Sequence, residues 1–271
     1  MLTWIDGRPD AELPVADRGL AYGDGLFETI AVRNGRAALL PHHLARLEDG
    51  LRRLAIDVDV TQVEAELSAF AAELHTGVAK LLITRGDGLR GYAAPQPSRA
   101  RRILLGNPLP AYPTSNAESG IRLFPCATRL AEQPLLAGLK HLNRLEQVLA
   151  RNEWQDSAFA EGLMRDVSGR VVEGVFSNLF LVRDGALFTP ALSRCGVAGV
   201  MRAQVLALAA REGIAVQVCD IAYEELLSAD EVFLCNSLYG IWPVRELAAS
   251  VWSVGPLTRK LQGFVRSLLD T

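Results

Sequence analysis

The segment PLPAYPTSNAES, residues 108–119, constrains the fold more than any other part of the sequence. It contains three prolines among small polar residues, and proline lacks the N–H group that a helix interior or a central strand requires. We therefore expect an interdomain linker at residues 109–119. It would join a small N-terminal domain, residues 1–108, to a larger C-terminal domain, residues 120–271.

Strand-like and helix-like patterns alternate before this linker. The dipeptide Asn34-Gly35, between two apolar stretches, is typical of a two-residue hairpin turn. Apolar residues recur at helical spacing over residues 41–54 and 63–74, which predicts two amphipathic helices, whereas residues 79–86 and 100–106 have the composition of strands. These patterns predict a small α/β domain.

Short strands dominate after the linker. Ser168-Gly169 and Asp184-Gly185 are turn signals between stretches of apolar and β-branched residues. Helical spacing is confined to three regions, at about residues 142–154, 200–212 and 257–269. The chain as a whole is therefore predicted to be an α+β protein whose C-terminal domain is rich in β-strands.

The charge of the chain argues against nucleic acid as a partner. The formal net charge of −3 supplies no basic field for a phosphate backbone, so a small-molecule substrate fits better. The first residues have neither the basic nor the apolar region of a signal peptide, and apolar runs elsewhere are far shorter than the roughly 20 residues of a membrane span. We expect a cytoplasmic protein that does not contact a membrane.

The four cysteines lack the spacing of a metal site. They are far apart in the sequence, without a CxxC pair, and most have apolar neighbours: Cys126, Cys195, Cys219 and Cys235. We expect reduced, buried thiols, with no disulfide framework and no bound metal.

Residues 86–91, GDGLRG, match the GxGxxG pattern of dinucleotide-binding loops. The third glycine of such a loop must open a helix, but Pro95 and Pro97 follow here and prevent one. The match is therefore accidental as a nucleotide signature. The same loop carries Arg85 and Arg90 beside Tyr92, a set suited to binding carboxylates.

Lys140 stands just before the predicted helix at residues 142–154 and has leucines at positions 136, 139 and 142. Taken alone, it could be an ordinary solvated lysine. The alternative is a Schiff-base lysine, whose amine must be neutral and therefore desolvated among apolar neighbours.

Two further patterns meet the needs of pyridoxal phosphate, which requires an acid opposite its ring nitrogen and a cationic, amide-rich site for its phosphate. Glu173 ends a strand-like stretch, and Gly196 and Gly199 precede a predicted helix whose first N–H groups and dipole attract an anion. A surface carboxylate and a plain helix cap would look much the same, so these residues alone leave both alternatives open.

Taken in order, YGDGLFETI, KHLNRLEQVLAR, VVEGVFSNLFLV, RCGVAGVMR and DEVFLCNSLYGIWPV resemble the fold-type IV pyridoxal phosphate enzymes over nearly the whole chain. This group contains branched-chain and D-amino acid aminotransferases and the aminodeoxychorismate lyases. KHLNRLEQVLAR, RGDGLRGY and RCGVAGVMR look most like the lyases. Branched-chain enzymes have a glycine-richer sequence after their lysine, and D-amino acid enzymes lack the arginine that stands here as Arg144.

The resemblance implies pyridoxal 5′-phosphate as the cofactor and the two-domain fold of this group. Lys140 would form the Schiff base and Glu173 would bind the ring nitrogen. The residues implied around the phosphate and ring are Arg46, Ser237, the backbone N–H groups of Val200 and Met201, and the neighbouring Gly199 and Asn178. Aminotransferases of the group usually have threonine where Met201 stands, so one side-chain hydrogen bond is missing.

The implied reaction converts 4-amino-4-deoxychorismate into 4-aminobenzoate and pyruvate, a step of folate biosynthesis, by Schiff-base formation, proton abstraction and elimination. Arg90 and Tyr92 are expected to bind the carboxylates of the substrate. Relatives are homodimers, so a homodimer is expected here. A D-amino acid or branched-chain aminotransferase on the same scaffold is the alternative. The resemblance assigns no catalytic role to Asp24, Glu28 or His141.

Overall fold

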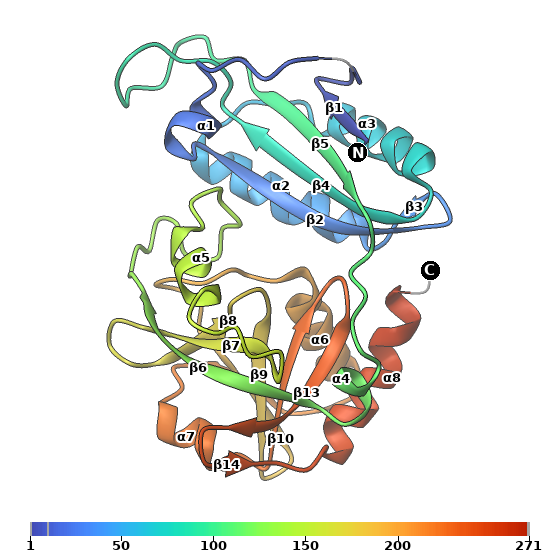
Figure 1. Ribbon diagram of the computed structural model, residues 1–271, viewed down its shortest axis with the longest axis vertical. Coiled ribbons are helices and arrows are strands. Elements are labelled where there is room, and N and C mark those ends of the chain that lie inside the picture. Colours follow the sequence, from blue (N-terminus) through green and yellow to red (C-terminus); the bar gives the residue numbers. More distant parts are fainter. Residues whose placement is uncertain (1, 10, 270–271) are drawn as a thin grey trace. The chain divides into compact units, whose positions relative to one another are not determined.

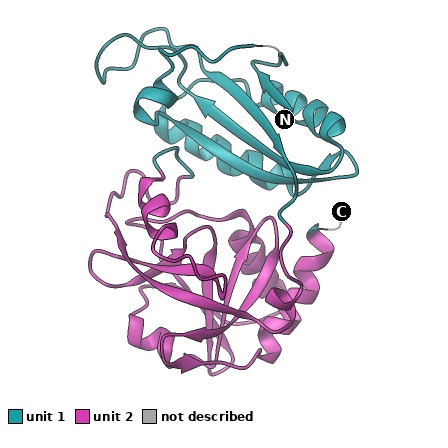
Figure 2. Cartoon of the chain, in the orientation of Figure 1, with its two compact units in different colours: residues 1–110, 140–143, 269–271 teal, residues 111–139, 144–268 magenta. Residues whose placement is uncertain are grey.

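The computed structural model describes residues 2–9 and 11–269, and the chain forms two compact units (Figure 2). Unit 1 comprises the described residues up to Pro110 together with Lys140–Asn143 and Leu269, and unit 2 comprises Ala111–Leu139 and Arg144–Leu268. The C-terminal domain was expected to carry Lys140, but its short segment packs in unit 1. The boundaries predicted for the two domains stay a prediction.

Unit 1 consists of one antiparallel sheet with helices packed against it (Figure 1). Among the described residues, the strand order is β1-β5-β4-β2-β3. The strands are β1 (Thr3–Ile5), β2 (Gly25–Arg33), β3 (Arg36–Ala37), β4 (Gly77–Thr84) and β5 (Arg101–Asn107). The helices are α1 (Arg18–Tyr22), α2 (Leu40–Leu54) and α3 (Val60–Leu74).

Local signals account for most of unit 1. Asn34 and Gly35 both have positive φ, 50° and 74°, as a type I′ turn requires, and they join β2 to β3 as predicted. Both predicted amphipathic helices are confirmed, and Leu44, Leu47 and Leu51 of α2 are buried. No helix follows the GDGLRG loop within residues 87–100, in agreement with the rejected nucleotide signature.

Unit 2 is built on a sheet whose strand order among the described residues is β11-β10-β9-β12-β13-β6-β7-β8, with β14 beside β13. A further pairing of β8 with β9 closes a ring of strands through β12, β13, β6 and β7. The strands are β6 (Ile121–Leu130), β7 (Phe159–Asp166), β8 (Val171–Gly174), β9 (Asn178–Arg183), β10 (Ala186–Pro190), β11 (Val216–Cys219), β12 (Glu231–Asn236), β13 (Gly240–Leu247) and β14 (Ser250–Val251). The helices are α4 (Ser115–Glu118), α5 (Leu145–Arg151), α6 (Val200–Arg211), α7 (Tyr223–Leu227) and α8 (Pro256–Leu269).

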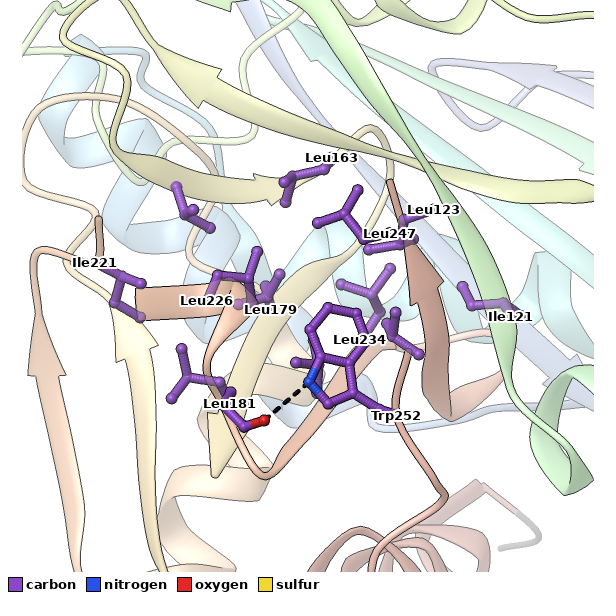
Figure 3. Close-up of a cluster of buried hydrophobic side chains, with 14 of the residues drawn as sticks. Ile121, Leu123, Leu163, Leu179, Leu181, Ile221, Leu226, Leu234, Leu247 and Trp252 are labelled. Carbon is purple, nitrogen blue, oxygen red and sulfur yellow. Dashed lines mark hydrogen bonds between the residues drawn. The ribbon is translucent and has the colours of Figure 1, made fainter. Parts of the chain in front are cut away.

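An apolar core holds this ring together (Figure 3). Inward-facing side chains of successive strands, such as Leu123, Leu163 and Leu234, are excluded from solvent. Trp252 packs into the same cluster, and its indole N–H donates to the carbonyl of Ala229 at 2.9 Å, so its one polar group is satisfied. Such burial of apolar surface is the main stabilising contribution to the unit.

The structure confirms the α+β class and corrects one helix. The helix predicted at about residues 142–154 extends only from Leu145 to Arg151, because the residues before it pair with β2 as an extended segment. Leu145, Val148 and Leu149 of this helix are exposed. Among the described residues, no helix combines the length and hydrophobicity needed to cross a bilayer.

Candidate functional site

Lys140 lies in an extended segment along the edge of β2. The N–H of Phe27 donates to the carbonyl of Lys140 at 2.9 Å, and the N–H of Leu142 donates to the carbonyl of Gly25 at 3.0 Å. The Nζ atom of Lys140 lies 4.2 Å from the centroid of the Phe27 ring. Hydrogen bonds to β2 therefore fix the backbone at Lys140 and just after it, and the amine lies against an aromatic face.

Arg144 adds a further constraint at this segment. In unit 2, its guanidinium donates to the carbonyl of Leu139 at 3.0 Å, on the peptide that immediately precedes Lys140. The arginine that distinguished the lyase resemblance in the sequence thus holds the backbone that leads into the lysine.

Arg46, on α2, belongs to a buried polar group with Glu28 and His43. Its Nε donates to Glu28 Oε1 at 2.8 Å and its Nη2 to Glu28 Oε2, and His43 Nδ1 lies 2.6 Å from the same Oε2. Because an ionised carboxylate can only accept, His43 carries its proton on Nδ1. Three residues of one strand and one helix therefore form a single charge-assisted network.

Electrostatics explain the charge states of this network. Burial by itself would raise the pKa of Glu28, but the charge of Arg46 and the hydrogen bond from His43 outweigh it and lower the pKa to about 2. Burial also lowers the pKa of His43, against the effect of Glu28, so its imidazole is neutral at pH 7. Arg46 is thus held in place by an ionised, almost fully buried carboxylate.

Unit 2 places Glu173 and Asn178 opposite each other, at the adjoining ends of β8 and β9. Both side chains bind the same residue: the N–H of Val197 donates to Glu173 Oε2 at 2.8 Å, and Asn178 Nδ2 donates to the Val197 carbonyl at 2.8 Å. Gly199 is required beside them, because a Cβ there would lie 1.9 Å from Asn178 Oδ1. The loop before α6 is therefore hydrogen-bonded to two of the residues that the sequence predicted at the cofactor.

That loop leads into α6 with its first amides uncapped. Gly199 is the N-cap residue and, within the described chain, no side chain caps the helix. The first N–H groups of a helix have no partner inside it and carry the positive end of its dipole, so the amides of Val200 and Met201 suit an anion. The side chain of Met201 is buried in the core, which leaves only its backbone for that role.

The chain that leads to Lys140 is paired with the same loop. Gly138 donates to the carbonyl of Gly196 at 2.9 Å, and Ala198 donates to the carbonyl of Gly138 at 3.0 Å. Unit 2 therefore brings together, around Val197, residues that lie far apart in sequence. Ser237 lies in the turn between β12 and β13, which Asn236 shapes by accepting two backbone N–H groups with its Oδ1.

Arg90 and Tyr92 lie on an exposed loop that a buried arginine anchors. Arg18 donates to the carbonyls of residues 91, 92 and 93 at 3.1, 2.9 and 3.3 Å, and its Nε donates to Asp24 at 2.8 Å. The side chain of Tyr92 is 87% exposed. The loop is therefore restrained through its backbone, while the side chains predicted to bind substrate project from it.

Arg85 does not have the role that the sequence suggested. It was grouped with Arg90 as a carboxylate ligand, but its three donors bind Asp24 and the carbonyls of Leu54 and Ala55, each at 2.8 Å. All three nitrogen atoms of its guanidinium therefore form hydrogen bonds inside unit 1, two of them to carbonyls at the end of α2.

Sequence reasoning assigned no role to Glu28 and Asp24, and it overlooked Arg18. One signal could have revealed Glu28: on β2 it shares one face with Leu26 and Ile30, the face that α2 covers. A charged residue on the buried side of a strand needs partners, so its position alone indicates a specific network. No comparable signal marks Arg18, because its partners are backbone carbonyls.

Comparison with known proteins places these features in a family. The profile of the family described as amino-transferase class IV matches residues 25–247. The sequence is 41% identical over 267 residues to the aminodeoxychorismate lyase of Vibrio harveyi, which covers 96% of this chain and 98% of that protein.

Solved structures agree with this similarity. The crystal structure of 4-amino-4-deoxychorismate lyase from Pseudomonas aeruginosa matches with a TM-score of 0.98 and 64% identity, over 100% of both chains. The branched-chain amino acid aminotransferase of Escherichia coli matches with a TM-score of 0.85 and 26% identity, over 98% of this chain and 93% of that one. The fold is thus common to lyases and aminotransferases, while the sequence is nearer to these lyases.

Proposed function

Because the chain belongs to the amino-transferase class IV family, we propose that it is a pyridoxal 5′-phosphate-dependent lyase that converts 4-amino-4-deoxychorismate into 4-aminobenzoate and pyruvate. One observation carries this proposal: 64% identity over the full length of a solved 4-amino-4-deoxychorismate lyase, against 26% for an aminotransferase of the same fold.

The side chains and amides of the chain fit this cofactor. Lys140 presents an amine against an aromatic ring, Glu173 is a buried carboxylate, and α6 begins with uncapped amides. When bound, pyridoxal phosphate supplies an aldehyde that joins amines covalently and a protonated ring that withdraws electrons. We assign its covalent bond to Lys140 and its ring nitrogen to Glu173. The phosphate is assigned to Arg46, Ser237 and the amides of Val200 and Met201, with Gly199 and Asn178 beside the cofactor.

Lys140 then performs the proton transfer. With pyridoxal phosphate and substrate bound, the Nζ of Lys140 would be the base that removes the proton from the carbon bearing the substrate nitrogen. The enolpyruvyl group would leave from the neighbouring carbon with the electron pair of the broken C–O bond and would take up a proton to become pyruvate. Glu173 would keep the ring nitrogen of the cofactor protonated, and the gain of an aromatic ring would favour elimination over aminotransfer.

The carboxylates of the substrate need cationic or hydroxyl partners. We assign them to Arg90 and Tyr92, whose side chains project from the loop that Arg18 anchors.

Exposed apolar residues support a homodimer, for which we propose a cytoplasmic location. On α5, Leu145, Val148 and Leu149 are 69%, 51% and 53% exposed, respectively, although they lie close together on one short helix. Apolar groups of this kind are typical of protein–protein contacts, and a second copy of the chain would cover them. Light scattering should therefore give twice the mass of the chain.

The decisive assay is the release of 4-aminobenzoate from enzymatically prepared 4-amino-4-deoxychorismate. The protein with pyridoxal phosphate should also absorb visible light, and Lys140→Ala should lose both the band and the activity. Lys80→Ala is the matched control, because Lys80 Nζ also lies near the Phe27 ring, at 5.3 Å. Equal loss in the two variants would contradict the role of Lys140.

The same preparation tests the aminotransferase alternative. Incubation with D-alanine or leucine and 2-oxoglutarate should give no keto acid beyond the background of Lys140→Ala. Sustained aminotransfer without release of 4-aminobenzoate would replace the lyase proposal.

A further inference from the structure

Glu161, on β7, has a carboxyl group that is excluded from solvent. The proposed reaction does not use this group. Its Oε1 accepts from the N–H groups of Gly162 and Val175 at 2.9 and 3.0 Å. Its Oε2 accepts from the N–H of Phe176 at 3.3 Å and from the hydroxyl of Ser177 at 2.8 Å. Three of these four donors come from one short connection of the chain.

That connection, residues 174–177, joins Glu173 to Asn178. It is tight: the N–H of Gly174 donates to the carbonyl of Ser177 at 2.7 Å. A Cβ on Gly174 would lie 2.2 Å from Ser177 Oγ and 3.1 Å from the carboxyl carbon of Glu161. The turn therefore wraps around the carboxyl group of Glu161, and only glycine fits where the wrapping is closest.

We propose that Glu161 is a positioning residue, which sets the places of Glu173 and Asn178 at the cofactor by holding the turn between them. The inference rests on the proposed function, because it gives those two residues their roles. Glu173 and Asn178 form the two ends of the turn and together hold Val197. A change in the turn therefore moves the acid, the carboxamide and the loop before α6 at once.

Glu231 shows what a purely structural carboxyl group looks like in the same unit. It is also buried, and its carboxylate accepts from the N–H of Leu257 at 3.1 Å and from the N–H and hydroxyl of Thr258 at 2.8 and 2.6 Å. These donors begin α8, and none belongs to a residue assigned to the cofactor. Glu231 thus matches Glu161 in burial and bonding but differs in what it holds.

The charge state of Glu161 suggests a conservative replacement. Burial raises the pKa of Glu161 to about 8, although its hydrogen bonds favour the charged form. No positive charge comes from the neighbouring titratable groups, which are Tyr112, Tyr239 and Cys126. Burial is the largest cause that raises the pKa of each of them, and the charge of Glu161 raises it further. The Ser177 hydroxyl at Oε2 can rotate to accept a hydrogen bond, so a glutamine whose N–H₂ group takes the place of Oε2 should be tolerated, whereas removal of the acceptor at Oε1 should not.

The test compares Glu161→Ala and Glu161→Gln with Glu231→Ala and Glu231→Gln. Affinity for pyridoxal phosphate and the pH titration of its visible band are measured, and thermal unfolding without cofactor reports stability. Glu161→Ala should weaken cofactor binding about 10- to 100-fold, the effect of misplacing one charged hydrogen bond, and should shift the titration of the band. Glu161→Gln should stay within a few-fold of wild type. Glu231→Ala should lose stability with unchanged affinity and titration.

Amide exchange in the cofactor-free protein supplies an independent measurement. Val175 and Phe176 should exchange faster in Glu161→Ala than in Glu161→Gln. Should Glu161→Ala not fold, Ser177→Ala removes one donor to the same carboxyl group and should shift the titration of the band in the same direction.

The outcomes separate the two proposals. A wild-type protein that does not bind pyridoxal phosphate would refute the proposed function and this role with it. If the wild type binds and depends on Lys140, but the alanine variants at 161 and 231 have the same affinity and titration, the positioning role is refuted and the lyase stands. If Glu161→Ala does not fold and Ser177→Ala is used in its place, a visible band that titrates as in the wild type would also refute the positioning role.

Discussion

Replacement of Glu28 by glutamine should remove an acid-sensitive contribution to stability. Glu28 is 2% exposed and binds both Arg46 and His43. A glutamine keeps one acceptor oxygen but turns an N–H₂ group toward donors, which leaves the guanidinium in a dry site without its counter-charge. The variant should therefore be less stable than wild type at neutral pH.

The pH dependence of this difference follows from the pKa of Glu28, about 2 when folded against an ordinary value of 4.5. A carboxyl group with a lowered pKa stabilises the folded state above its unfolded pKa and loses that effect as pH falls toward the folded one. At about 1.4 kcal/mol per pH unit, the whole contribution is about 3 kcal/mol. About 2 kcal/mol of it is lost between pH 7 and pH 3, because at pH 3 the unfolded carboxyl group is protonated and the folded one is not.

Urea unfolding at pH 7, 5 and 3 measures this effect. The wild type should have a larger free energy of unfolding than Glu28→Gln. This difference should be about 2 kcal/mol smaller at pH 3 than at pH 7. Glu48→Gln, an exposed position of α2, controls for the loss of one negative charge. A difference between wild type and Glu28→Gln that is constant across this range, or that grows on acidification, would refute the assigned charge state of the network.

Four further predictions test other contacts. Arg18→Lys cannot bind three carbonyls and a carboxylate together, so KM should rise about tenfold with a smaller change in kcat, measured by steady-state kinetics; an unchanged KM would contradict the anchoring role. In Gly199→Ala the new methyl group would meet Asn178 Oδ1, and cofactor affinity should fall about tenfold or more, as titration of the visible band would show. Val148→Lys should give a monomer in light scattering without loss of secondary structure by circular dichroism. Burial raises the pKa of Glu161 to about 8, so the folded chain keeps a proton that the unfolded chain releases above its ordinary pKa of 4.5. The stability of the wild type should therefore fall as the pH rises from 4.5 to 8, and that of Glu161→Gln should not. Urea unfolding would measure both.

Signals that act within a few residues were readable from the sequence. Asn34-Gly35 predicted a hairpin because these residues tolerate the positive φ of its turn, and the leucines of α2 predicted its buried face because helical periodicity is local. Gly199 likewise marked the start of α6, although the anion site predicted there stays a prediction. The family itself was recognisable from short motifs distributed over the chain.

Contacts between distant segments were not readable in this way. The stretch around Lys140 is extended because it pairs with β2, and the helix after it is shorter than its apolar spacing suggested. Arg85 belonged to the set suited to carboxylates in the sequence, and only the structure shows that Asp24 and the end of α2 bind it. The turn around Glu161 depends on the register of three strands, which no single stretch encodes.

The physical reason for this division is the range of the forces involved. Backbone dihedral preferences and hydrophobic periodicity depend on neighbours along the chain, so the order and type of most elements, and the residues suited to the chemistry, follow from the amino acids alone. The partner of a buried charge depends on which distant groups come within hydrogen-bonding distance, where desolvation makes an unpaired group costly. The pairing of Glu28 with Arg46 and His43, and that of Glu173 with Val197, are set only when the chain has folded.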